Sequence, residues 1–146
     1  MGTQLLPEFD PPLPGLGFGS DGKLLYWALD TLDQLAKEAG VPPLSTYLDN
    51  RPEPTDVDAW DDFEEGLERW RTARPDWHSP SDGVRTMEGV LAALRLKGPP
   101  VRLEGHLAVM PNGPELVAGL PDVLEPAAAA LRRVAACGSR FRLDLV

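Results

Sequence analysis

The stretch that decides the fold is Trp77–Gly98, WHSPSDGVRTMEGVLAALRLKG, because it carries the start, face and stop signals of a single helix. Ser79 or Ser81 can cap the first amides, and Pro80 suits a first helical turn. Gly98 and the two prolines after it end the pattern. The apolar residues that recur at steps of three and four are Val84, Met87, Leu91 and Leu94. The sequence therefore predicts a helix over residues 80–97 with one apolar face.

Three further stretches have the periodicity of amphipathic helices. Residues 23–39 place their apolar side chains on one face and end at a glycine followed by Val-Pro-Pro. Residues 57–73 space their aromatic and leucine side chains three or four apart. Residues 122–137 are rich in alanine, and Pro126 means that this helix either begins there or carries a kink. Packing of these four helices is expected to form the core.

The ends of the chain and residues 101–109 follow other patterns. Residues 101–109 and 140–146 alternate apolar and polar side chains, which predicts two strands that pair with each other. Residues 1–22 are rich in proline and glycine, so we expect an extended arm without a helix or a central strand. The predicted fold is mainly α, with a small two-stranded β element, and α+β is the alternative. The predicted organisation is an arm, 1–22, and a single helical domain, 23–146.

Two pieces of the chain resemble other proteins. They are W-x-x-P-x-D-G-V-x-T-M-x-x-V-L-x-A-L at 77–94, and the alanine-rich helix from 122 with C-G-S-R-F-R-L at 137–143. Both pieces are similar to sequences in a group of small, uncharacterised bacterial proteins. The resemblance implies a helix followed by a C-terminal strand, and it assigns no activity and no site residue.

Composition excludes several classes of partner. The net charge is -9 and the isoelectric point is about 4.6, whereas nucleic-acid binding requires a basic surface. No run approaches the roughly 20 apolar residues of a membrane helix, and the N-terminus lacks the features of a signal peptide. The single cysteine cannot form an internal disulfide. We therefore expect a cytoplasmic protein that binds neither nucleic acid nor membranes.

No cofactor or metal is predicted. Residues 17–23, GFGSDGK, have the spacing of a phosphate-binding loop, but Leu24 replaces the hydroxyl residue that holds magnesium, and no buried strand precedes the loop. Magnesium binding through Asp58, Asp61 and Asp62 is an alternative to an acidic helix face that is simply solvated.

His78 is the principal candidate for a chemical site. It lies between Asp76 and Asp82, and a histidine flanked by carboxylates can act as a general base. The alternative is a loop histidine near the start of a helix. No serine or cysteine stands in a recognisable nucleophile motif, so no catalytic residue is predicted, and these three residues define only a possible pocket.

Charge is segregated along the chain, and this suggests a function. Residues 53–68 contain eight acidic residues and no basic one. We expect a non-enzymatic interaction protein, of adaptor or immunity type, that presents this helix face to a basic protein partner. The predicted partner-binding residues are Asp58, Trp60, Asp61, Asp62, Glu64, Glu65 and Trp70. The alternatives are a small ligand-binding domain or enzyme with a site near His78, and a structural subunit of a homo-oligomer whose apolar arm, residues 5–18, inserts into a neighbouring chain.

Overall fold

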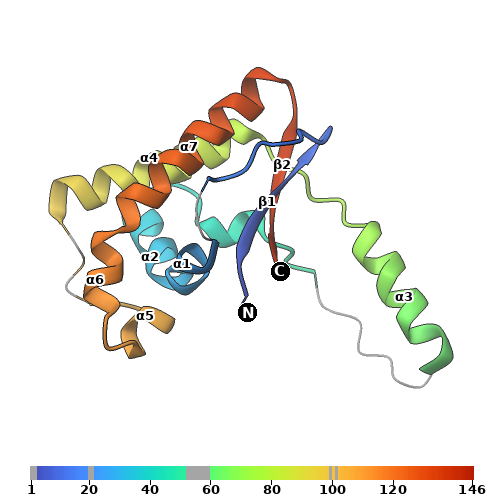
Figure 1. Ribbon diagram of the computed structural model, residues 1–146, viewed down its shortest axis with the longest axis horizontal. Coiled ribbons are helices and arrows are strands. Elements are labelled where there is room, and N and C mark those ends of the chain that lie inside the picture. The colour runs from blue at the N-terminus through green and yellow to red at the C-terminus, as the bar shows by residue number, and fades with distance from the viewer. Residues whose placement is uncertain (1–2, 20–21, 52–59, 99, 101) are drawn as a thin grey trace.

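The computed structural model of the chain is mainly helical and has one small two-stranded antiparallel sheet, as the sequence predicted (Figure 1). It describes residues 3–19, 22–51, 60–98, 100 and 102–146, and for residues 60–62 only the backbone. The expected start of the 57–73 helix lies outside the described residues.

The two longest helices form the centre of the molecule. Helix α4, Pro80–Lys97, has the predicted bounds, and helix α7, Leu120–Ala136, begins before Pro126 and continues through it. The two helices lie side by side, and their small residues allow a close approach (Figure 1). A Cβ on Gly83 would lie 2.6 Å from the ring of Phe141 and 2.8 Å from Leu131. Gly83 thus lets α4 approach both α7 and the sheet.

The predicted helix over 23–39 is two helices, α1 (Gly22–Trp27) and α2 (Leu29–Ala39), that meet at Ala28. The Ala28 amide still bonds to the Leu24 carbonyl, so the chain turns between the two helices without an intervening loop. Gly40 ends α2 in the left-handed conformation, as expected for the glycine after a helix. The short 3-10 helix η1, Leu44–Tyr47, follows and buries both of its end residues. Helix α2 and η1 both pack against α4.

The sheet joins the two ends of the chain. Strand β1, Leu5–Asp10, pairs antiparallel with β2, Arg140–Leu145, and the register places Leu5 opposite Leu145 and Phe9 opposite Phe141. Gln4 and Val146 exchange both backbone hydrogen bonds, so the alternation of an antiparallel ladder turns the backbone of Pro7 away from β2. The missing N–H of Pro7 therefore costs no ladder bond, which explains how a proline fits into this edge strand.

The predicted pairing of 101–109 with the C-terminal strand was wrong. The described residues of 101–109 contain no strand, and helix α5, His106–Val109, occupies the second half. Gly105 has a φ of 60°, which breaks the extended course. Glu104 instead exchanges hydrogen bonds with the Thr31 hydroxyl, at 3.0 and 3.1 Å. The outer edge of β2 is also occupied, because the backbones of His78 and Phe141 exchange two hydrogen bonds there.

Helices α5 and α6, Gly113–Ala118, form a compact turn before α7. A Cβ on Gly113 would lie 2.3 Å from the Leu107 carbonyl oxygen, so the glycine allows the two helices to meet. Leu107 and Val117 are buried in the same core as the main helices. This segment lies at the end of the molecule where α4 ends and α7 begins (Figure 1).

Helix α3, Trp60–Thr72, stands clear of the body of the molecule (Figure 1). No other helix or strand of the described chain packs along it, and the core contains none of its described residues. The core is built instead from the other helices together with Leu5, Phe141 and Leu143 of the sheet. Three of the four predicted helical stretches therefore form the core, and α3 lies outside it.

Candidate interaction surface

The sequence of α3 places favourable charges near both ends of the helix. Acidic residues occupy its first half, near the positive end of the helix dipole, and Arg69 and Arg71 occupy its last turns. The Thr72 hydroxyl donates back to the carbonyls of Glu68 and Arg69, at 3.0 and 3.2 Å, and the Ala73 amide also bonds to the Arg69 carbonyl, at 2.9 Å, in the last turn. The helix ends before Pro75, as expected.

The acidic side of α3 faces solvent. Glu64, Glu65 and Glu68 are all exposed, and within the described residues the ion pair of this group is that of Glu65 with Arg69, at 3.1 Å. Both side chains of that pair are more than two-thirds exposed to solvent, so the pair contributes little to stability. Asp58 and the side chains of Asp61 and Asp62, which the sequence assigned to the same face, lie outside the described residues. The described glutamates thus form a solvated acidic surface.

The opposite side of α3 is apolar and only half-buried. Phe63, Leu67 and Trp70 lie on it, and the Arg51 guanidinium stacks on the Trp70 ring at 4.3 Å from the ring centre. Arg51 is itself held by Asp49, at 2.9 Å, and this pairing lowers the pKa of the Asp49 carboxyl. The sequence did not point to Arg51. The side chain of Trp60 lies outside the described residues.

Arg74 anchors the C-terminal end of α3 to the body. Its guanidinium is buried and donates to the carbonyls of Tyr47 and Leu143, both at 3.0 Å, and to the carboxylate of Asp76. The Arg142 guanidinium in turn donates to the Arg74 carbonyl at 3.2 Å. These bonds fix the point at which the chain returns to the body after α3. A buried arginine cannot be recognised from sequence, because its partners are backbone carbonyls of distant segments.

The structure does not gather Asp76, His78 and Asp82 around a described cavity. Asp76 is engaged by Arg74, and Asp82 is exposed in the first turn of α4. The His78 ring lies edge-on to Tyr47, with the ring centres 5.2 Å apart, and near Phe141. The Nε2 atom of His78 is buried and has no hydrogen-bond partner among the described residues. The hypothesis of a pocket near His78 therefore stays a prediction without a cleft to support it.

Carboxylates and arginines alternate on the outer face of the sheet. Arg142 pairs with Glu8 at 2.8 Å and stacks on Trp77 at 4.0 Å from the ring centre, and Arg140 pairs with Asp10 at 2.6 Å. Burial, together with the neighbouring Glu8, raises the pKa of the Asp144 carboxyl. Arg140 and Arg142 thus form ion pairs across the β1–β2 pairing.

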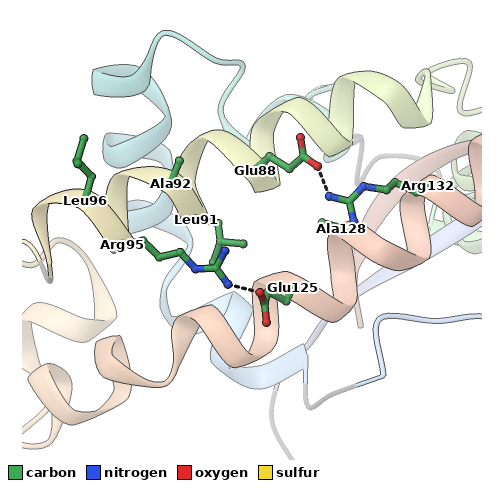
Figure 2. Close-up of a pocket in the computed structure, with 8 residues that line it drawn as sticks. All are labelled: Glu88, Leu91, Ala92, Arg95, Leu96, Glu125, Ala128 and Arg132. Atoms are coloured by element: carbon green, nitrogen blue, oxygen red, sulfur yellow. Dashed lines mark hydrogen bonds and ion pairs between the residues drawn. The ribbon is translucent and has the colours of Figure 1, made fainter.

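A shallow groove between α4 and α7 has a volume of about 700 Å³ (Figure 2). Leu91 and Ala128 line it, and the pairs Glu88–Arg132 and Arg95–Glu125 bridge the two helices across it. Leu96, which is 85% exposed, points away from the helices beside it. The sequence analysis missed this groove. The sequence feature that could have indicated the groove is Leu96, an apolar residue that lies outside the predicted apolar face of α4.

No family model matches the sequence, and neither a curated protein nor a solved structure shows significant similarity to it. The function must therefore be argued from the chain itself. None of the helices in the described part is both long and apolar enough to cross a bilayer. Within the same residues, no group of three or more histidine, cysteine or acidic side chains is placed to hold a metal ion.

Proposed function

We propose that the protein is a non-enzymatic interaction module, of adaptor or immunity type, that binds a basic protein partner through the acidic face of α3. The residues proposed to contact the partner are Asp58, Trp60, Asp61, Asp62, Glu64, Glu65 and Trp70. Of the acidic ones, the structure describes the side chains of Glu64 and Glu65, which are exposed, as is the neighbouring Glu68. The single cysteine suits a reducing compartment, so the proposed location is the cytoplasm. The observation that carries the proposal is the position of α3, an acidic helix that contributes no described residue to the core.

Charge distribution supports this assignment. Residues 53–72 contain eight acidic residues and two arginines, so they account for -6 of the net charge of -9. Elsewhere, several acidic side chains pair with arginines of neighbouring elements, as in Glu88–Arg132 and Asp10–Arg140. A concentrated negative potential on a projecting helix accelerates encounter with a cationic surface. The fold has no comparable need for the charges on α3.

Exposed acids also restrict the chemistry of the partner. Carboxylates that are fully hydrated bind best to guanidinium and ammonium groups that can approach from solvent. Such contacts weaken as the salt concentration rises, because exposed charges are screened. The partner is therefore expected to present several arginine or lysine side chains along a helix or a loop.

The test compares two triple variants with the same change in charge. One is Glu64→Ser, Glu65→Ser, Glu68→Ser on α3, and the matched control is Glu38→Ser, Glu115→Ser, Asp122→Ser on α2, α6 and α7, where all three side chains are exposed. Each is used to capture proteins from a lysate of the source organism at low and high salt. We expect a basic protein that is retained at low salt by the native chain and the control, and lost by the α3 variant. Retention by all three proteins, or equal loss from both variants, would rule the proposal out.

A further inference from the structure

The two central helices carry the same short sequence pattern. Residues 88–95 of α4 read EGVLAALR and residues 125–132 of α7 read EPAAAALR. Both segments begin with a glutamate and end with an arginine, and the leucine just before that arginine is buried in each, as Leu94 and as Leu131. The glutamate and the arginine are about two helical turns apart, so they lie on the same side of their helix. The chain thus presents two copies of one charged helix surface.

The structure sets these two segments side by side in opposite directions. Glu88 of α4 accepts a hydrogen bond from Arg132 of α7, and Glu125 of α7 accepts one from Arg95 of α4 (Figure 2). The start of each segment therefore lies beside the end of the other. We call these four side chains the corner charges, because they stand at the four corners of the α4–α7 groove. Their signs alternate around the groove.

The middle of the groove is apolar and its side chains are mostly small. Leu91 and Ala128 line it, and both are buried. Ala92 of α4 and Ala129 of α7 are exposed, and Leu96, which also lines the groove, is 85% exposed. Alanine allows the axis of another helix to approach more closely than a long side chain does. The face can therefore accept a second pair of helices between its corner charges.

The corner charges keep hydrogen-bonding capacity for a second molecule. In each ion pair one guanidinium nitrogen, Nη2, donates to one carboxylate oxygen, Oε1. All four side chains are about half exposed, with values from 48% to 55%. Each carboxylate has a second oxygen and each guanidinium has further N–H groups. An approaching surface can thus bind the corner charges without breaking the pairs within the chain.

A second copy of the same face matches the alternating signs. Two copies can meet face to face around a twofold axis that runs between them, either along the helices or across them. In both arrangements every glutamate of one copy lies opposite an arginine of the other, and every helix is antiparallel to the helix that it faces. The helix dipoles are then also opposed favourably. A partner surface of a single sign would instead attract two corner charges and repel the other two.

We propose that two copies of this chain associate through the α4–α7 groove, so that α4 and α7 of both copies form a four-helix bundle with the corner charges at its interface. The contact is isologous, so it closes as a dimer and does not propagate. The inference goes beyond the proposed function, because it concerns a different face of the molecule and requires no other protein.

The first test measures the mass of the purified protein by light scattering across a range of concentrations. We expect the native chain to reach twice the chain mass of 15.9 kDa. The double variant Glu88→Arg, Glu125→Arg, called the positive variant, has four arginines at the corners, and its self-association should be at least about tenfold weaker, because like charges then meet. The matched control is Glu38→Arg, Glu115→Arg, which makes the same change in charge at exposed positions of α2 and α6 and should dimerise as the native chain does. A native chain that stays monomeric at every concentration would overturn the proposal, and so would equal behaviour of the two variants.

A single substitution in the middle of the face leaves both ion pairs intact. Ala92→Lys adds a charge at an exposed helical position, so the variant should keep the thermal unfolding transition of the native chain. In the dimer the added lysines would be taken out of water without a partner, and we expect the variant to be monomeric. The matched control is Ala39→Lys, at an exposed position of α2, which should dimerise. A dimer of Ala92→Lys as tight as that of the native chain would rule out the groove as the contact.

The decisive test mixes two variants that cannot pair with themselves. The negative variant, Arg95→Glu, Arg132→Glu, has four glutamates at the corners and should be monomeric alone. We expect an equimolar mixture of the positive and negative variants to form a mixed dimer, because each corner again meets the opposite charge. The negative variant should form no mixed dimer with the control Glu38→Arg, Glu115→Arg. Variants that stay separate on mixing, or mixed dimers with the control as well, would overturn the proposal.

These outcomes do not depend on the proposed function of α3. The protein is pure in each measurement, so no basic partner is present, and none of the variants changes a residue of α3. A dimer that forms through the groove while lysate capture fails would reject only the proposed function. Salt-dependent capture by a chain that is monomeric throughout would reject only the dimer.

Discussion

At the scale of single residues, Arg74 holds together parts of the chain that lie far apart in sequence. Its guanidinium bridges the Tyr47 carbonyl at the end of η1, the Leu143 carbonyl in β2 and the carboxylate of Asp76. Burial of a cation is unfavourable unless its hydrogen bonds are made, and here carbonyls and a carboxylate supply them. The position is thus sensitive to any change that removes the charge or its donors.

Replacing Arg74 by alanine should lower the free energy of unfolding by about 3 kcal/mol, because two buried carbonyls and one carboxylate lose their donor. The matched control is Arg69→Ala, which removes an arginine from an exposed ion pair and should cost less than about 0.5 kcal/mol. Urea denaturation of both variants measures the difference. Equal costs would show that the buried network contributes nothing beyond a surface pair.

Tyr47 gives the protein a specific response to alkaline pH. Burial is the main cause that raises the pKa of its hydroxyl above 10.0, while the hydrogen bond with Thr86, at 2.9 Å, acts in the opposite direction. The folded chain therefore keeps this proton at pH values at which the unfolded chain releases it. The free energy of unfolding should fall as the pH rises above about 10.

Tyr47→Phe should remove this part of the alkaline sensitivity. At neutral pH the variant loses one hydrogen bond, at a cost of about 1 kcal/mol, and Thr86 keeps its bond to the Pro42 carbonyl. Between about pH 9 and 11 the stability of the native chain should then decline more steeply than that of the variant. Chemical denaturation across this pH range measures both slopes, and parallel slopes would exclude Tyr47 as the responsible group.

At the scale of elements, α3 and α4 show how the same helical periodicity leads to different environments. Both were predicted as amphipathic helices, and both form. The apolar face of α4 is covered by α2, α7 and the sheet, whereas no described element packs along α3. One glycine from each helix illustrates this difference: a Cβ on Gly83 of α4 would meet Phe141 and Leu131, whereas a Cβ on Gly66 of α3 would have no atom within 4 Å.

Alanine at these two glycines should have opposite effects. Gly83→Ala would bring a methyl group against Phe141 and Leu131, and we expect a cost of about 1–3 kcal/mol in the free energy of unfolding. Gly66→Ala meets no atom within 4 Å and should increase the helicity of α3 by its higher propensity, worth about 1 kcal/mol locally. Urea denaturation and circular dichroism measure the two effects. A neutral Gly83→Ala would show that α4 can move away from the sheet.

At the scale of the whole molecule, the fold is closed by its two ends. Leu5 is fully buried, and β1 holds β2 in place against α7 and the core. The Pro/Gly-rich beginning of the chain, which was expected to be an extended arm, thus supplies a strand and a core residue. The division at residue 22 into an arm and a domain stays a prediction, and so does insertion of residues 5–18 into a neighbouring chain.

The neighbours Leu5 and Leu6 test this closure, because they lie on opposite faces of the same strand. Leu5→Ala should lower the free energy of unfolding by about 2–4 kcal/mol through the cavity that it leaves. Leu6→Ala, at a half-buried position, should cost about 1 kcal/mol or less. Denaturation midpoints of both variants measure the costs. A small effect of Leu5→Ala would mean that the first strand is dispensable for the core.

The sequence by itself determined the features that depend on near neighbours along the chain. Residues 80–97 carried their own cap, periodicity and stop, so the helix appeared with the predicted bounds, and 140–146 contained the expected strand. The same local signals predicted the amphipathic character of α3, but not whether anything covers its apolar face. The alternation of apolar and polar residues at 101–109 was misleading, because such a pattern indicates which side chains share a face but does not identify a partner strand.

Only the tertiary structure decided which segments meet. It paired the strand at 140–145 with Leu5–Asp10, satisfied Glu104 through Thr31, and buried Arg74 beneath carbonyls from two distant segments. It also left the described residues of α3 outside the core, with the acidic side chains of Glu64, Glu65 and Glu68 exposed to solvent. The physical reason is that helix signals act over three or four residues, whereas strand pairing and burial depend on contacts between residues that lie far apart in the sequence.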